Sequence, residues 1–149
     1  MHLHEVRTES LAGSQLQDGV LEIVGLLRSW ALDRVDLSYG WGCNLPMDKL
    51  WRPQQIDAAQ LGAFVEQSVA EGTFRFGQCD LHIEDLRRTL KFTICHESDI
   101  HFESAARELV DEIVSRWLVR FSVLYVRTGP KGSARAAEQW SRRIPTSGR

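Results

Sequence analysis

One short acidic segment holds most of the side chains that could do chemistry. His96-Glu97-Ser98-Asp99-Ile100-His101 concentrates imidazole and carboxylate groups, the usual ligands of zinc and other divalent metals. On an extended chain Glu97, Asp99 and His101 lie on one face, and His82 lies near them on a neighbouring strand. The candidate ligands of a divalent metal such as zinc are therefore His82, Glu97, Asp99 and His101, with Glu103 as the base of a metal-dependent enzyme.

The same acidic surface also fits a protein-binding function, which we favour over catalysis. The segment lacks the His-Glu-x-x-His spacing that places two histidines on one side of a helix. Neighbours on a strand point to opposite faces, so Cys95 and His96 are not expected to form a catalytic pair, and we predict no catalytic residue. The expected contacts with a basic protein partner are Asp80, Glu84, Glu97, Asp99 and Trp51.

Two alternating runs position these residues. In Cys79–Glu84 and in Leu90–Phe102 the apolar side chains share one parity and the polar, mostly acidic side chains share the other. Because side chains alternate between faces along a strand, the runs predict a β-hairpin with one apolar and one acidic face. A four-residue loop then pairs Glu84 with Thr89 and His82 with Lys91, and it brings Asp80 opposite Thr93.

The remaining elements follow from helical spacing and capping signals. Helices are expected over 14–30, capped by Ser14, and after the N-cap Asp57. A third helix begins at Ser104 and continues to Phe121. Strands are expected over 34–41 and 123–126, and Leu3 and Val6 fit a short additional strand.

From residue 34 onward this order is β-α-β-β-α-β. It predicts an α+β fold with a ferredoxin-like core, in which a four-stranded antiparallel sheet carries both helices on one face. An extra N-terminal helix and a short C-terminal helix over 134–143 complete the expectation. Residues 1–143 are expected to form a single α+β domain, and residues 144–149 a disordered tail.

Composition narrows the class of protein. The chain has 149 residues, three cysteines and a net charge of −2; residues 127–149 carry six Lys and Arg against one Glu, a net +5, which leaves −7 for the rest. An acidic body disfavours nucleic acid as a partner, and an odd cysteine count disfavours a disulfide framework. No apolar stretch could span a membrane, and the N-terminus lacks the apolar core of a secretion signal, so a cytoplasmic protein is expected.

A small, acidic chain poor in catalytic motifs has the format of bacterial inhibitors and immunity proteins. The segment Trp41–Pro53 adds Met47 and Trp51, residue types common in binding hot spots, although such loops more often fold their aromatic side chains onto the core. The apolar strand over 122–126 lies at the sheet edge in this fold, so a homodimer that covers it is a further expectation.

Overall fold

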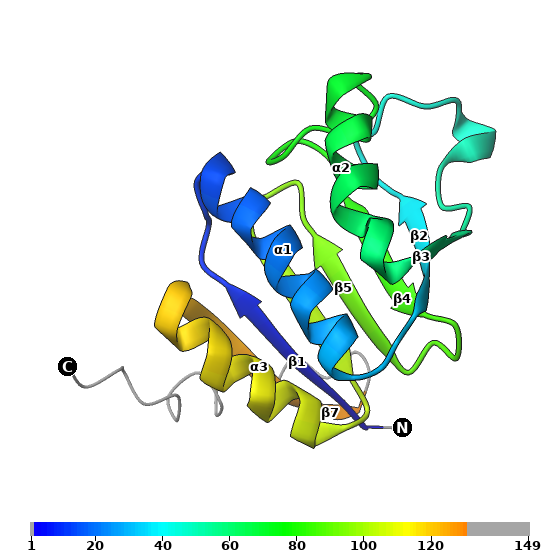
Figure 1. Ribbon diagram of the computed structural model, residues 1–149. Helices are drawn as coiled ribbons and strands as arrows, with labels where there is room; N and C mark the ends of the chain where they lie inside the picture. The colour runs from blue at the N-terminus through cyan, green and yellow to red at the C-terminus, as the bar shows by residue number, and fades with distance from the viewer. Residues whose placement is uncertain (1, 131–149) are drawn as a thin grey trace.

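An antiparallel sheet and three α-helices make up residues 2–130, the part of the chain that this computed structural model describes (Figure 1). In chain order the elements are β1 (His2–Thr8), α1 (Gly13–Ser29), β2 (Arg34–Tyr39), β3 (Gln54–Asp57), α2 (Leu61–Ala70), β4 (Leu81–Asp85), β5 (Leu90–Ile94), β6 (Ile100–Ser104), α3 (Arg107–Arg120) and β7 (Val123–Pro130). Short 3₁₀ turns cover Met47–Lys49 and Ala58–Gln60. No helix within residues 2–130 is both long enough and apolar enough to cross a bilayer.

The mixed α+β class is confirmed, but the four-stranded ferredoxin-like core is not. The sheet has seven strands in the order β3-β2-β4-β5-β6-β1-β7. The N-terminal strand β1 inserts between β6 and β7, and β3 adds to the outer edge of β2. The short additional strand that Leu3 and Val6 suggested is present as β1, although Val6 is its one strongly apolar inward residue. β3 escaped prediction because its sequence, Gln-Gln-Ile-Asp, has a weak pattern.

All three α-helices cover the same face of the sheet (Figure 1). Trp30 at the end of α1 and Trp117 of α3 both contact Phe92 of β5, with ring centroids 6.1 and 6.5 Å away. Phe64 of α2 packs on Tyr39 of β2 at 6.1 Å. Burying this face provides most of the core, and it leaves the polar side chains of β2, β4, β5, β6 and β1 on a second face, here called the open face.

The predicted strand 90–102 is in fact two strands. β5 ends at Ile94, a tight turn follows, and β6 begins at Ile100, so Thr93 pairs with His101 and Phe92 with Phe102. The first hairpin also differs in register by two residues, since His82 pairs with Thr93 and Glu84 with Lys91. A shift of two preserves the side-chain alternation, which is why the predicted faces are correct although the predicted pairs are wrong.

Element ends show where local signals misled. Helix α1 is capped at Ala12, whose N–H donates to Gln15 Oε1 at 3.0 Å, and not at Ser14. Asp57 ends β3 and is also the N-cap residue of the 3₁₀ turn Ala58–Gln60 that leads into α2, as expected, but its side chain makes no capping hydrogen bond. Residues 71–80 form a loop. The predicted helix 134–143 and tail 144–149 lie outside the described residues.

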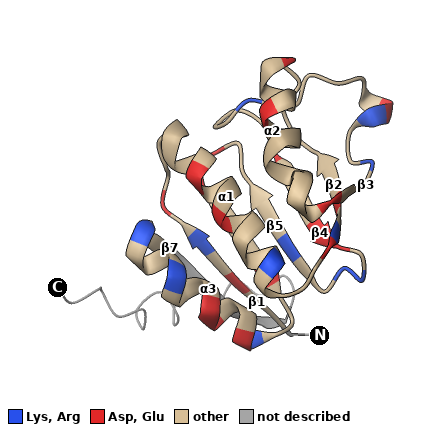
Figure 2. Cartoon of the chain, viewed as in Figure 1, with Lys and Arg blue, Asp and Glu red and all other residues tan. Residues whose placement is uncertain are grey.

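Ion pairs join helices α1 and α3, which both lie on the covered face of the sheet. Acidic positions occur along α1 and basic positions on α3 (Figure 2). The buried carboxylate of Glu22 accepts a hydrogen bond from Arg116 Nε at 2.9 Å, and Arg120 Nη1 lies 3.7 Å away. This contact fixes α3 beside α1 and satisfies a carboxylate that the helices would otherwise leave buried and unpaired.

Asp85 determines the turn between β4 and β5. Its Oδ1 accepts the N–H groups of Thr89 at 2.6 Å and of Leu90 at 3.0 Å, and its Oδ2 accepts the Thr89 hydroxyl. We expect Asp85→Ala to lower the free energy of unfolding by about 2–4 kcal/mol, because the buried N–H of Leu90 and the partly buried N–H of Thr89 both lose their acceptor. Urea denaturation measures this change.

Two variants calibrate that measurement. Thr89→Val removes the hydroxyl bond alone and should cost about 1 kcal/mol. Asp111→Ala removes an exposed i,i+4 pair and should change stability by less than about 0.5 kcal/mol. A stability of Asp85→Ala equal to that of Asp111→Ala would contradict this role for Asp85.

Candidate functional site

The candidate site lies at one end of the open face, where β5 ends and β4 and β6 begin. The chain turns sharply between the last two strands: Cys95 N–H donates to Asp99 O at 2.9 Å, and Ser98 N–H donates to Cys95 O at 3.0 Å. Ser98 has φ +67°, which allows this tight reversal. The turn therefore places Cys95 and Asp99 opposite each other at the strand ends.

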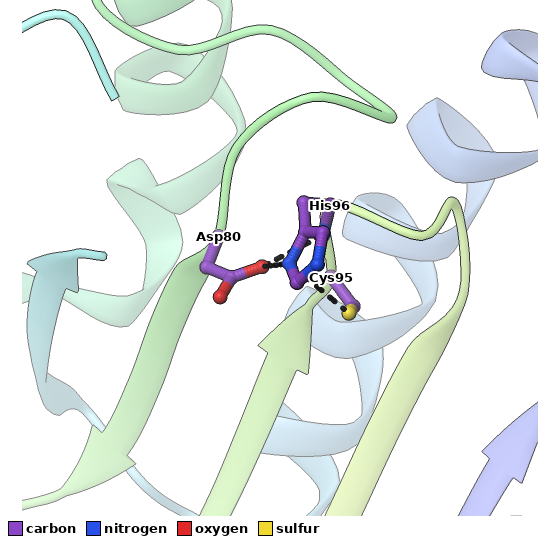
Figure 3. Close-up of side chains that lie close together, drawn as sticks. All are labelled: Asp80, Cys95 and His96. Carbon is purple, nitrogen blue, oxygen red and sulfur yellow. Dashed lines mark hydrogen bonds and ion pairs between the residues drawn. The ribbon is translucent and has the colours of Figure 1, made fainter. Parts of the chain in front are cut away.

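Asp80, Cys95 and His96 converge at this end of the sheet (Figure 3). Asp80 Oδ1 accepts both the His96 backbone N–H, at 2.7 Å, and Nδ1, at 2.8 Å. Cys95 Sγ lies 3.8 Å from the same Nδ1 atom. The expectation that Cys95 and His96 point apart is wrong, because the chain leaves the strand at Ile94 and the alternation of faces ends there.

A second group shares Cys95 and extends along β6. Asp99 Oδ2 binds His101 Nε2 at 2.8 Å, and Arg7 Nη1 approaches it at 3.8 Å. Asp99 Oδ1 is buried and has no hydrogen-bond partner within the described chain. In each of the two groups, Asp80-Cys95-His96 and Cys95-Asp99-His101, the potential ligand atoms lie within 4.8 Å of one another.

Burial and neighbouring charges set the protonation states of these groups. Burial raises the pKa of the Cys95 thiol to about 12, so the sulfur is protonated at neutral pH and is a poor nucleophile. The hydrogen bond that His96 donates to the Asp80 carboxylate raises the pKa of His96. Burial alone would raise the pKa of Asp99, but its hydrogen bond and charge interaction with His101 outweigh burial and lower it.

The metal ligands expected from the sequence come together only in part. Asp99 and His101 bind each other, whereas Glu97 is exposed in the turn, where its backbone carbonyl accepts the Ser10 hydroxyl at 3.4 Å. His82 lies two strands from His101, with Thr93 between them. Its Nδ1 contacts Thr93 Oγ1 at 3.2 Å, and its Nε2 is buried without a partner among residues 2–130.

Sequence reasoning missed the grouping of Asp80 with Cys95 and His96. The observed pairing of Leu81 with Ile94 places Asp80 beside Cys95, whereas the expected register placed Asp80 opposite Thr93. The one available signal was Asp85, whose carboxylate can accept hydrogen bonds from the turn that follows it. Those bonds favour a loop over 86–89, one residue later than the expected loop over 85–88.

The segment Trp41–Pro53, here called the Trp loop, borders the open face and exposes large apolar side chains. Trp41 is 65 % exposed, Met47 84 % and Trp51 55 %. Trp51 has φ +64° and donates its N–H to Tyr39 O at 2.7 Å, and its ring lies 5.5 Å from that of His82. The more common outcome, in which a loop buries its own aromatic side chains in the core, does not occur here.

Two rows of side chains cross the open face beside this loop. The strand register aligns Ser38, His82, Thr93, His101 and Arg7 in one row, and Asp36, Glu84, Lys91, Glu103 and Glu5 in the next. The second row has four carboxylates and one ammonium group, so the face is acidic. Trp51 of the Trp loop contacts His82 of the first row, so the loop and the two rows together form one candidate surface.

Comparison of the chain with protein-family models, with curated proteins and with solved structures gives no match. Function is therefore inferred from the geometry of the open face and of the strand ends.

The pKa values of His82 and His96 should be shifted in opposite directions. Burial, with the Lys91 charge second, lowers the pKa of His82 to about 4, whereas the Asp80 hydrogen bond raises that of His96 above 6.5. Protonated His96 stabilises the fold fully below pH 6.5, and this contribution is lost as pH rises through its raised pKa. His82 has the opposite effect. The free energy of unfolding falls as pH drops from 6.5 towards 4, because His82 binds a proton in the unfolded chain but stays neutral in the folded protein.

NMR titration of the metal-free protein measures both values. Asp80→Asn should bring the pKa of His96 back towards 6.5 and leave His82 neutral at pH 5.5 or above. An ordinary titration of His82 near 6.5 in the folded protein would show that its ring is not buried as described.

Proposed function

We propose that this protein is a non-catalytic interaction module that binds a basic protein partner through the open face and the Trp loop. One observation carries the proposal: Trp41, Met47 and Trp51 are exposed on one ordered loop beside an acidic sheet face. Large apolar side chains that a fold leaves in solvent, next to groups of one charge, are typical of contact surfaces.

The Trp loop is held in place before any partner arrives. Backbone hydrogen bonds tie it to its surroundings at both ends and in the middle: Asp80 N–H to Trp41 O at 2.8 Å, Asn44 N–H to Thr73 O at 3.0 Å, and Trp51 N–H to Tyr39 O at 2.7 Å. A loop that is already ordered loses less conformational entropy on binding, so more of the contact energy becomes affinity.

Charge provides the preference for a basic partner. Glu84 and Glu97 are the accessible carboxylates of the expected contact set, together with Trp51. The side chains of Asp80 and Asp99 are only 13 % and 9 % exposed and already bind His96 and His101, so they supply negative potential more than direct contact. Such a surface attracts a basic site and repels phosphate backbones, which fits an inhibitor or immunity-type protein that covers a partner's cationic site.

Variants of the surface test the proposal by affinity capture. Immobilised wild-type protein should capture a basic protein at low salt and lose it as salt rises, since screening weakens the acidic face. Trp51→Ala should weaken capture by at least about tenfold, as expected for a central aromatic contact. Glu84→Arg should also weaken it, mainly by slowing association.

Leu21→Ala is the matched control. Leu21 is 65 % exposed but projects from α1 on the helical side, so its loss should leave capture unchanged. Equal capture by wild type, Trp51→Ala and Glu84→Arg would contradict the proposal, and so would a partner that binds only when Leu21 is present.

A further inference from the structure

We propose that Asp80, Cys95 and His96 form a binding site for a divalent cation of the zinc type, with a fourth coordination position facing solvent. The three side chains come from the start of β4 and the end of β5, and their potential ligand atoms lie within 4.8 Å of one another. The inference goes beyond partner binding and does not depend on it, because it concerns a different property of the strand ends.

Distances between the side chains suit tetrahedral coordination. Zinc bonds of about 2.3 Å to sulfur and about 2.0 Å to nitrogen imply a sulfur–nitrogen separation of about 3.6 Å. Cys95 Sγ and His96 Nδ1 are 3.8 Å apart. His96 Nδ1 and Asp80 Oδ1 are 2.8 Å apart as a hydrogen-bonded pair, and they need to separate by about 0.6 Å to share a zinc ion.

Charge around His96 favours a cation. The charges that act on its ring come from Asp80, Glu97 and Asp99, which are all acidic. The neighbouring group Cys95-Asp99-His101 is a weaker candidate, because Asp99 Oδ2 already binds His101 and has Arg7 within 3.8 Å. A guanidinium group at that distance opposes a second positive charge.

The buried carboxylate of Asp99 is a second, independent observation, because it places negative charge beside Cys95. The Asp99 side chain is 9 % exposed, and its Oδ1 atom accepts no hydrogen bond within the described chain. An Asp99 oxygen and Cys95 Sγ lie within 4.8 Å of each other. Unpaired buried carboxylate oxygens are costly, and a cation on Cys95 would offset that cost through its charge.

The chemistry of the three donors selects the class of metal. One thiolate, one imidazole and one carboxylate suit zinc and similar transition metals, whereas calcium and magnesium prefer oxygen ligands alone. Binding replaces the proton on Cys95 Sγ with the metal, and the proton on His96 Nδ1 moves to Nε2 or to solvent. The affinity should therefore rise with pH, because protons compete for the same ligand atoms.

The side chain of His96 leaves an entry path. It is 40 % exposed, whereas that of Asp80 is 13 % exposed and Cys95 is buried. A cation can therefore reach the group from solvent on the His96 side, and three protein ligands leave one position for water. Structural zinc sites use four protein ligands, so this arrangement matches the open type.

Metal titration of the untagged, chelator-treated full chain tests the site. Native mass spectrometry with Zn²⁺ should show one ion per chain. Co²⁺, used as a spectroscopic substitute, should give a thiolate-to-cobalt charge-transfer band and intense visible bands of tetrahedral coordination. Cys95→Ser and His96→Gln should each weaken binding by at least about tenfold.

Two substitutions separate this ligand set from its neighbours. Glu97→Gln changes an exposed carboxylate in the same turn and should leave affinity within about twofold of wild type. His101→Gln should also retain the cobalt spectrum, since His101 belongs to the other group. If Cys95→Ser does not fold, two results still decide whether this ligand set is correct. They are the charge-transfer band of the wild-type protein and the affinity of His96→Gln, which changes a side chain that is 40 % exposed.

Three results would contradict the assignment of Asp80, Cys95 and His96 as metal ligands. The first is wild-type protein that binds no metal at micromolar concentration. The second is a cobalt spectrum without a thiolate band. The third is a loss of binding in Glu97→Gln or His101→Gln that equals the loss in His96→Gln, since the ligands would then lie elsewhere on the open face.

Discussion

Burial of one face of the sheet is the constraint on which the rest of the structure depends. Phe92 and Phe102 on neighbouring strands are fully buried beneath Trp30 and Trp117, so these side chains have no contact with water. Because alternate side chains must point the other way, the same strands carry His82, Lys91 and Glu103 on the open face. Core and candidate surface are thus two consequences of one pattern, and a mutation that shifts a strand by one residue would disrupt both.

That dependence explains what the sequence could and could not predict. Alternation identified the apolar and polar faces of β4, β5 and β6 correctly, and helical spacing found α1 and α3 to within a few residues. Pairing was harder: the register was wrong by two, because either position of the loop keeps Leu81 and Ile83 on the core face. β1 was indicated only by Leu3 and Val6, and β3 carries too few apolar residues for a local pattern, so pairing in the sheet stabilises both as strands.

The candidate site depends on features that local patterns do not encode. Cys95 and His96 lie together because β5 ends at Ile94, and the turn through Ser98 then brings Asp99 to face Cys95. Asp80 joins them only in the observed register. Sequence reasoning placed candidate ligands at this end of the hairpin, but it included Glu97, which is exposed in the turn, and did not include Cys95 or His96. The exposure of the Trp loop was also not predictable from local sequence, since composition alone does not show whether Trp41 and Trp51 lie in the core or on the surface.

Carboxyl footprinting tests the central claim, that the face opposite the helices is open to solvent and available to a partner. In the free protein, carbodiimide labelling followed by peptide mass spectrometry should modify Asp36, Glu84 and Glu103, at rates between those of exposed Glu97 and buried Glu22. Asp85, which is 5 % exposed in its turn, should resist labelling as Glu22 does. Labelling of Asp36, Glu84 and Glu103 as slow as that of Asp85 would contradict the account, because the acidic face would then be covered.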